Sequence, residues 1–180
     1  MPNVGSVTNA PQYLTLRRHR DLGGRRRQPW LRRAFVVFLV AFPAFGLANV
    51  FGQSPLSSVA ANAVARLQVV AADRLRGGLL GQQKFRVTAY RSIKHATLVL
   101  DRGWTDGLQM NTIVPYPLGQ SDRGGRLAMD FGHIPAGGSL TVRIEFQVNP
   151  TLVGSRPQGV ELDDGQQPIV RVNRTLTVFP

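Results

Sequence analysis

The chain has 180 residues, a net charge of +12 and no cysteine, so beside a membrane segment it has room for one soluble domain of ordinary size. The absence of cysteine excludes a disulfide framework, thiolate metal ligands and a cysteine nucleophile. The charge is uneven, because eight arginines and one acidic residue precede Ala34, whereas fourteen basic and nine acidic residues follow from there. Those later arginines are scattered singly rather than forming a basic stripe with aromatics, so we expect no nucleic acid among the partners.

The N-terminal third of the chain predicts a tail followed by a membrane helix. Residues 1–29 are rich in Asn, Gly, Pro, Arg and Gln without an apolar pattern, which is typical of a disordered cytoplasmic tail. The run 34–51 has no charged residue, and a helix of that length rises about 27 Å, close to the roughly 30 Å hydrocarbon core of a bilayer. We therefore expect a transmembrane helix over residues 30–53. The basic residues that flank it and predict a cytoplasmic N-terminus are Arg25, Arg26, Arg27, Arg32 and Arg33.

Two interpretations of this segment remain open. A retained signal anchor is favoured, because the apolar run is longer than the roughly 7–15 residues of a signal-peptide core. Alternatively, Arg32-Arg33-Ala34-Phe35 resembles a twin-arginine export signal, with Ala61-Asn62-Ala63 as a cleavage site. On the first interpretation the protein is a single-pass protein of the cell membrane, and the lipid bilayer is one of its partners. Residues 54–64 then form a linker to an extracytoplasmic domain.

The rest of the chain, residues 65–180, predicts β-strands. In Ser139–Val148 every second residue is apolar, as in a strand with one buried face. Shorter segments of the same kind cover residues 67–71, 85–90, 96–101, 110–114, 127–131, 159–162 and 169–178. Gly and Pro separate them and no amphipathic helix intervenes, so the pattern predicts an all-β fold, an antiparallel sandwich of about seven or eight strands.

Several motifs in this region resemble known families. The stretch from Gly132 to Val142, GHIPAGGSLTV, resembles the corner that precedes a long strand in bacterial surface immunoglobulin-like domains. Further motifs are similar to those of uncharacterised actinobacterial membrane-anchored proteins: Gly103–Gly107, Asn111-Thr112, Phe146–Thr151 and Val178–Pro180. The resemblance implies an immunoglobulin-like β-sandwich over residues 65–180. It implies no activity, because those families have none established and a fold does not define a function.

No catalytic or metal-binding pattern accompanies the strands. His95 and His133 lack further ligands at a recognisable spacing, and no Gly-x-Ser-x-Gly motif occurs. The segment Asp101–Gly107 has two carboxylates and two glycines but lacks the alternating oxygen ligands of a calcium loop. A turn in which Trp104 folds over the edge of the core is the favoured explanation. We therefore expect no enzyme, no cofactor and no metal.

Two aromatic residues in predicted loops, Trp104 and Tyr116, are candidates for a partner-binding surface. Together with the anchor, they favour a protein-binding or scaffolding module in the bacterial cell envelope, with another membrane or envelope protein as partner. The alternative is a carbohydrate- or cell-wall-binding module, because sandwiches also bind glycans through surface aromatics.

Overall fold

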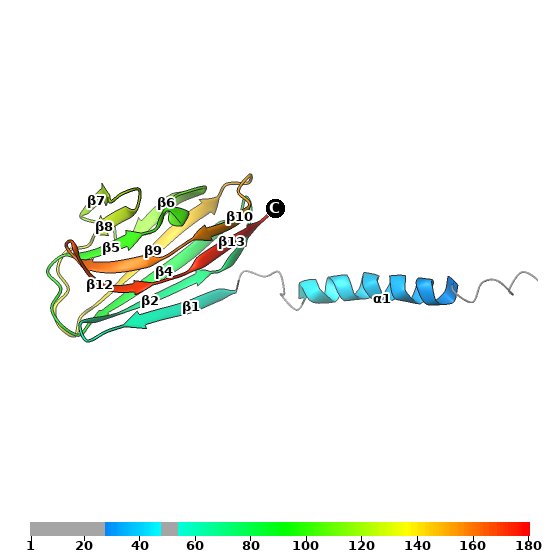
Figure 1. Cartoon of the computed structure of the whole chain (residues 1–180), viewed down its shortest axis with the longest axis horizontal. Helices are drawn as coiled ribbons and strands as arrows, with labels where there is room; N and C mark the ends of the chain where they lie inside the picture. Colours follow the sequence, from blue (N-terminus) through cyan, green and yellow to red (C-terminus); the bar gives the residue numbers. More distant parts are fainter. Residues whose placement is uncertain (1–27, 48–53) are drawn as a thin grey trace, which may run out of the picture. The chain divides into compact units, whose positions relative to one another are not determined.

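The computed structural model describes residues 28–47 and 54–180. The chain divides into an N-terminal unit, which contains helix α1, and a C-terminal unit made of strands (Figure 1). Residues 1–27 of the expected tail, which include Arg25 to Arg27, and the end of the expected membrane segment lie outside the described residues, whereas Gln28 and Pro29 begin helix α1.

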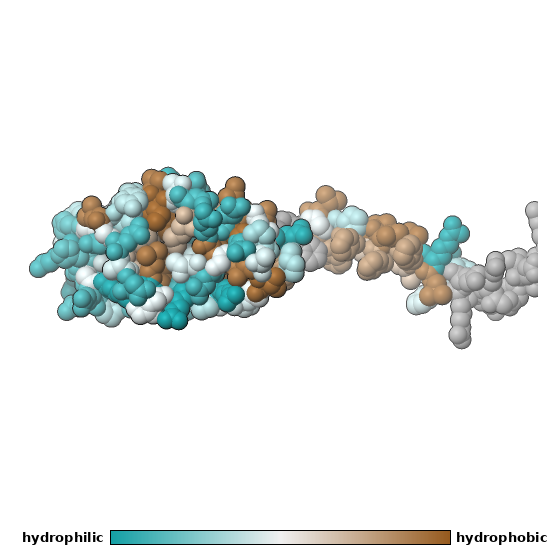
Figure 2. All heavy atoms as spheres, turned by 90° about the horizontal axis from the view of Figure 1, so that it is seen from above, coloured by the Kyte–Doolittle hydropathy of each residue, from teal (hydrophilic) through white to brown (hydrophobic). Residues whose placement is uncertain are grey.

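Helix α1 (Gln28–Leu47) carries Gln28, Arg32 and Arg33 in its first two turns and has no charged residue from there to its end. Its segment Pro29–Leu47 is long and apolar enough to cross a membrane, and no part of it is buried against other described residues. Phe35, Val40 and Phe42 are each more than 60% exposed, and Figure 2 shows brown, apolar residues along the visible side of the helix. Pro43 lies inside the helix. Membrane helices tolerate an internal proline because neighbouring groups hydrogen-bond the backbone group that it leaves unpaired. The prediction of an apolar N-terminal helix is thus confirmed.

The C-terminal unit contains two five-stranded antiparallel sheets and a smaller third sheet. The first sheet has the order β1 (Pro55–Ala61), β2 (Ala65–Ala72), β4 (Leu80–Ala89), β9 (Ser139–Val148), β6 (Leu108–Val114). The second has the order β12 (Gln167–Val172), β11 (Val160–Asp164), β5 (Ala96–Leu100), β8 (Leu127–Asp130), β7 (Gly119–Asp122). In the third, β13 (Thr175–Phe179) lies between β10 (Gly154–Pro157) and β3 (Arg74–Arg76) and runs parallel to β3.

The core lies between the sheets. Alternate residues of the first sheet, such as Phe85 and Ile144, and of the second, such as Leu98 and Leu162, are at most 1% exposed and belong to one apolar cluster. A second cluster contains Leu176 and other residues of β13 and β9. The first sheet thus buries one face and leaves the other to solvent, whereas the central strand β5 of the second sheet is buried on both faces. This confirms the predicted all-β sandwich preceded by an apolar helix.

Two sequence-based boundaries were wrong. The expected linker over residues 54–64 contains strand β1, which pairs with β2 along its whole length. Its small, mostly exposed residues give no apolar alternation, so the sequence carried no signal for it. The expected strand 169–178 is two strands, because the chain turns at Asn173-Arg174 and β13 leaves the second sheet for the third. With the short strands β3, β7 and β10, the number of strands exceeds the predicted seven or eight.

Arg174 explains the break between β12 and β13. Its guanidinium donates hydrogen bonds to the carbonyl oxygens of Leu56, Val69 and Ala71 at 3.1, 3.2 and 2.6 Å. Burial lowers the pKa of Arg174 despite the nearby Asp73. The side chain therefore ties the C-terminal strand to β1 and β2. On the same side of the sandwich, Asn62 Nδ2 donates to the carbonyl of Ile169 at 2.7 Å. The edge strands on the opposite side are β6 and β7.

Candidate partner-binding surface

Trp104 lies in the core, contrary to the prediction that it is an exposed partner-binding residue. Helix η2 (Arg102–Trp104) turns the indole inward, where it is 2% exposed. Its ring meets Phe85 edge to face at a centroid distance of 5.2 Å, and Nε1 donates to the carbonyl of Gly159 at 3.1 Å. With its apolar face packed and its one donor satisfied, Trp104 has a structural role. The segment Asp101–Gly107 is the turn that the sequence favoured over a calcium loop.

Tyr116, in contrast, is 78% exposed. It lies in the connection between β6 and β7, with Val114 52% and Leu118 78% exposed on either side. Pro115 and Pro117 separate these three residues and fix the backbone φ angle at their own positions. The surface formed by Val114, Tyr116 and Leu118 is hereafter the apolar connection.

The apolar connection is held in place by its own backbone. Pro117 is buried, and the N–H of Leu118 donates to the carbonyl of Asp130 at 2.7 Å. Leu118 also packs closely over Gly132, where an added Cβ would lie 2.8 Å from Leu118 Cδ1. A segment ordered in this way loses little conformational freedom when a partner binds.

The strands on either side of the apolar connection are edges of the two large sheets. Among the described strands, β6 pairs only with β9, and β7 pairs only with β8. The β6 ladder shifts register at Asn111, and no charged residue occurs from Gly107 to Ser121. Charged residues, proline and β-bulges normally protect free edges against pairing, and this edge has the bulge at Asn111 and two prolines but no charge in that stretch. This side of the sandwich therefore offers apolar side chains and unpaired backbone groups together.

The outer face of the second sheet carries an ion-pair network instead. Asp101 contacts Arg126 at 3.1 Å and Arg171 at 2.6 Å, and Glu161 contacts the same two arginines. Beside these four residues, Arg123 pairs with Asp163 at 2.8 Å. Three carboxylates thus face three arginines, and the network neutralises itself. Hereafter we call these six residues the ion-pair network.

The network shifts two carboxyl groups in opposite directions. Burial alone would raise the pKa of Glu161, but hydrogen bonds and charges from Arg126 and Arg171 lower it below its ordinary value. Burial raises the pKa of Asp163, and the charge of Glu161 adds to that rise against the opposing pull of Arg123. The arginines thus lower the pKa of Glu161, whereas burial and the charge of Glu161 raise the pKa of Asp163.

The two histidines of the sandwich each lie near one polar side chain. His133 Nε2 lies 2.9 Å from the hydroxyl of Ser92, and His95 Nδ1 lies 4.0 Å from Asp130. Within residues 28–47 and 54–180, no group of three His, Asp or Glu side chains could hold a metal. Arg32 and Arg33 lie near the start of α1.

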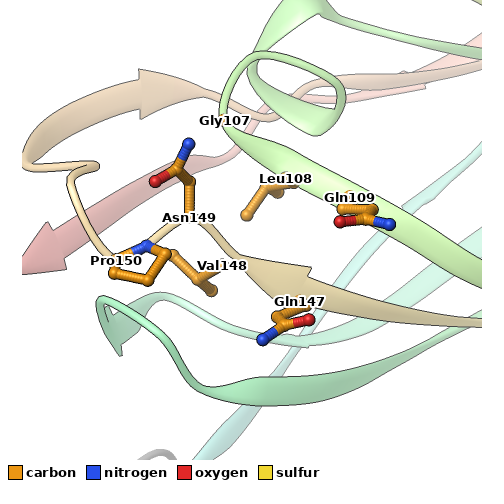
Figure 3. Close-up of a pocket in the computed structure, with 7 residues that line it drawn as sticks. All are labelled: Gly107, Leu108, Gln109, Gln147, Val148, Asn149 and Pro150. Carbon is orange, nitrogen blue, oxygen red and sulfur yellow. The ribbon is translucent and has the colours of Figure 1, made fainter.

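A shallow hollow of about 360 Å³ lies where β6 and β9 meet at one end of the first sheet (Figure 3). Gln109, Gln147 and Asn149 are its polar side chains, and Gly107, Leu108, Val148 and Pro150 complete it. It contains amides but no titratable side chain, so it lacks a general acid, a general base and a nucleophile.

No family model matches the chain, and no curated protein matches it. Several solved structures show limited similarity, among them three domains of prokaryotic proteins. CaCohA2 from Clostridium acetobutylicum has a TM-score of 0.41 and 14% identity, covering 65% of this chain and 92% of its own. A non-cellulosomal cohesin from Archaeoglobus fulgidus has a TM-score of 0.34 and 13% identity, covering 59% and 86%. The CARDB domain of a Pyrococcus furiosus protein, solved with di-metal ions, has a TM-score of 0.33 and 12% identity, covering 70% and 94%. Similarity at this level transfers no ligand or partner to this chain.

Proposed function

We propose that this protein is a single-pass membrane protein that presents a non-catalytic β-sandwich outside the cytoplasm as a binding or scaffolding module of the bacterial cell envelope. Helix α1 supports the anchor, because apolar side chains cover it on every side from Ala34 onward and nothing described buries them. The arginines before and within the start of the helix support a cytoplasmic N-terminus.

The apolar connection is the observation that carries the binding role. Val114, Tyr116 and Leu118 are large, apolar and exposed on an ordered segment. Tyrosine is a preferred residue at protein interfaces, and the free edges of β6 and β7 can accept an added strand. The partner is a protein of the membrane or envelope that covers this surface with apolar side chains.

The glycan alternative is weaker than this proposal. It depended on both Trp104 and Tyr116 being exposed on the surface. Trp104 is buried, so Tyr116 is the exposed one of these two candidates. The carbohydrate-binding module is therefore not our proposal.

A photo-crosslinking amino acid at position 116 tests the partner surface in intact cells. We expect one discrete protein adduct. The same amino acid at Phe179, which is also an exposed aromatic at 48% but lies in the third sheet, is the matched control. A second probe at Val114 in a Leu118→Ser background measures whether the adduct depends on the apolar surface, and we expect it to be lost there.

Two results would overturn the partner surface. One is recovery of the monomer alone from position 116. The other is equal adducts from positions 116 and 179, because a specific interface crosslinks from its own surface and not from every exposed aromatic.

A further inference from the structure

The outer face of the first sheet gathers cations that are scattered in the sequence. Lys84 and Arg86 on β4 and Arg143 on β9 alternate with buried residues, so they point away from the core. Arg66 on β2 points the same way. We call these four side chains the basic face.

The register places these cations beside one another. Lys84 on β4 lies directly opposite Arg143 on β9, and Arg86 lies two residues after Lys84 on β4. Arg66 is diagonal to Arg86, because Gln68 is the residue opposite Arg86. Opposed residues on one sheet face are about 5 Å apart at Cβ and diagonal ones about 7–8 Å. Like charges in direct opposition destabilise a sheet, so this arrangement has a cost that the fold alone does not require.

No carboxylate of the described chain pairs with these cations. None of the four cations makes an ion pair or a side-chain hydrogen bond within residues 28–47 and 54–180. The one carboxylate on the face, Glu145, lies opposite Gln82 on β4 and Thr112 on β6, diagonal to Lys84, and accepts a hydrogen bond from Gln82 at 3.4 Å rather than pairing with a cation. Four cations thus share a face with one carboxylate, whereas the arginines of the ion-pair network are neutralised.

We propose that the basic face binds the phosphate headgroups of an anionic lipid surface. Charge complementarity calls for an anion, and a membrane supplies a planar field of them that suits the outer face of a sheet. Only residues 48–53 separate α1 from the first described residue of the sandwich, and six residues reach at most about 20 Å when fully extended. The inference therefore rests on the proposed function, since a helix anchored in the bilayer keeps the sandwich near the headgroups.

Site-specific fluorescence in reconstituted vesicles tests this contact. The chain has no cysteine, so Thr88→Cys on the basic face and Ser121→Cys on β7 of the second sheet each give one label, the second as control. The full chain is reconstituted in phosphatidylcholine vesicles or in vesicles that also contain phosphatidylglycerol, with a quencher on the headgroups. We expect strong quenching of the label at position 88 only with phosphatidylglycerol, and weak quenching at position 121 in both.

Removing cations from the basic face measures how strongly they contribute to contact with the anionic surface. A cation near an anionic surface contributes a factor of roughly five in affinity, so the triple variant Lys84→Gln, Arg86→Gln, Arg143→Gln lowers the equilibrium constant for surface contact about 100-fold. The quenching at position 88 then falls to the control level, and high salt has the same effect on the parent chain because it screens exposed charges.

Two results would overturn the inference. The first is equal quenching at position 88 in neutral and anionic vesicles. The second is a response of that label to soluble polyphosphate in neutral vesicles with none to phosphatidylglycerol, which would make the face a site for a linear polyanion. Failure of the proposed anchor gives a different result, because the chain would then not sediment with the neutral phosphatidylcholine vesicles.

Discussion

The outer faces of the two large sheets use arginine in different ways. On the second sheet, Arg126 and Arg171 each contact both Asp101 and Glu161. On the first sheet, Lys84 and Arg143 lie opposite each other, and neither forms an ion pair within the described part of the chain. The side chains of Asp101 and Glu161 are only 14% and 17% exposed, whereas Arg86 and Arg143 are exposed to solvent.

This difference separates structural charges from charges available to a partner. A partly buried pair is costly to break, because the remaining charge is left without its partner. An exposed, unpaired cation contributes little to folding and is free to bind an anion. Substitutions on the second sheet should therefore lower stability, and substitutions on the first should alter binding.

The largest expected effect is from Asp101→Ala. It leaves Arg126 and Arg171 each with one carboxylate fewer, and we expect the free energy of unfolding to fall by about 2–3 kcal/mol. Urea denaturation of the full chain in detergent measures it. Lys84→Gln is the control, and an equal loss in both variants would contradict the division between the two faces.

A somewhat smaller loss is expected from Gly159→Ala. A Cβ at this position would lie 2.3 Å from Asp101 Oδ2 and 2.7 Å from Arg171 Nη2, so the Asp101–Arg171 pair must separate, at about 1–2 kcal/mol. In the Asp101→Ala background the same change should cost clearly less, because it has less left to disrupt. Full additivity of the two substitutions in urea denaturation would show that Gly159 acts elsewhere.

The two shifted carboxyl groups predict opposite effects of acid. The lowered pKa of Glu161 gives stability that is fully present above its ordinary value of 4.5 and is lost as the pH falls through the folded-state value. The raised pKa of Asp163 makes the folded state bind its proton first, so acid recovers stability there. In thermal melts from neutral pH to well below 4.5, Glu161→Gln should flatten the acid loss of stability and Asp163→Asn should steepen it. The reverse order would refute these assignments.

The smallest effect is from Lys84→Gln. Removing one of two opposed cations should leave stability unchanged or raise it by about 0.2–0.5 kcal/mol. Urea denaturation gives the value, and a loss above about 1 kcal/mol would mean that Lys84 has a structural role.

Much of the fold was predictable because it depends on local patterns. Alternation in Ser139–Val148 gave β9 with its observed bounds, and the uncharged run gave the apolar helix. Strand β1 was missed because its stability comes from pairing with β2 rather than from its own apolar residues. The end of β12 was missed because Arg174 binds carbonyl groups more than 100 residues away.

The surfaces were harder to predict, because they join distant segments. Trp104 and Tyr116 both follow strand signals in Gly- or Pro-rich stretches, and only the packing on Phe85 separates the buried one from the exposed one. Asp101 and Arg171 are 70 residues apart, so no local pattern could pair them. For the basic face a partial signal existed: Lys84 and Arg86 alternate with Phe85 and Val87, although their neighbour Arg143 depends on the register of β9.

The most direct test of the anchored, outward-facing sandwich is labelling of single cysteines with a membrane-impermeant maleimide. In a chain without native cysteine, Ser121→Cys reports on the sandwich and Ser6→Cys on the N-terminus. We predict that intact cells label position 121 and that position 6 reacts only after lysis. Labelling of position 6 alone in intact cells, or release of the labelled sandwich into the medium without its N-terminus, would contradict the account.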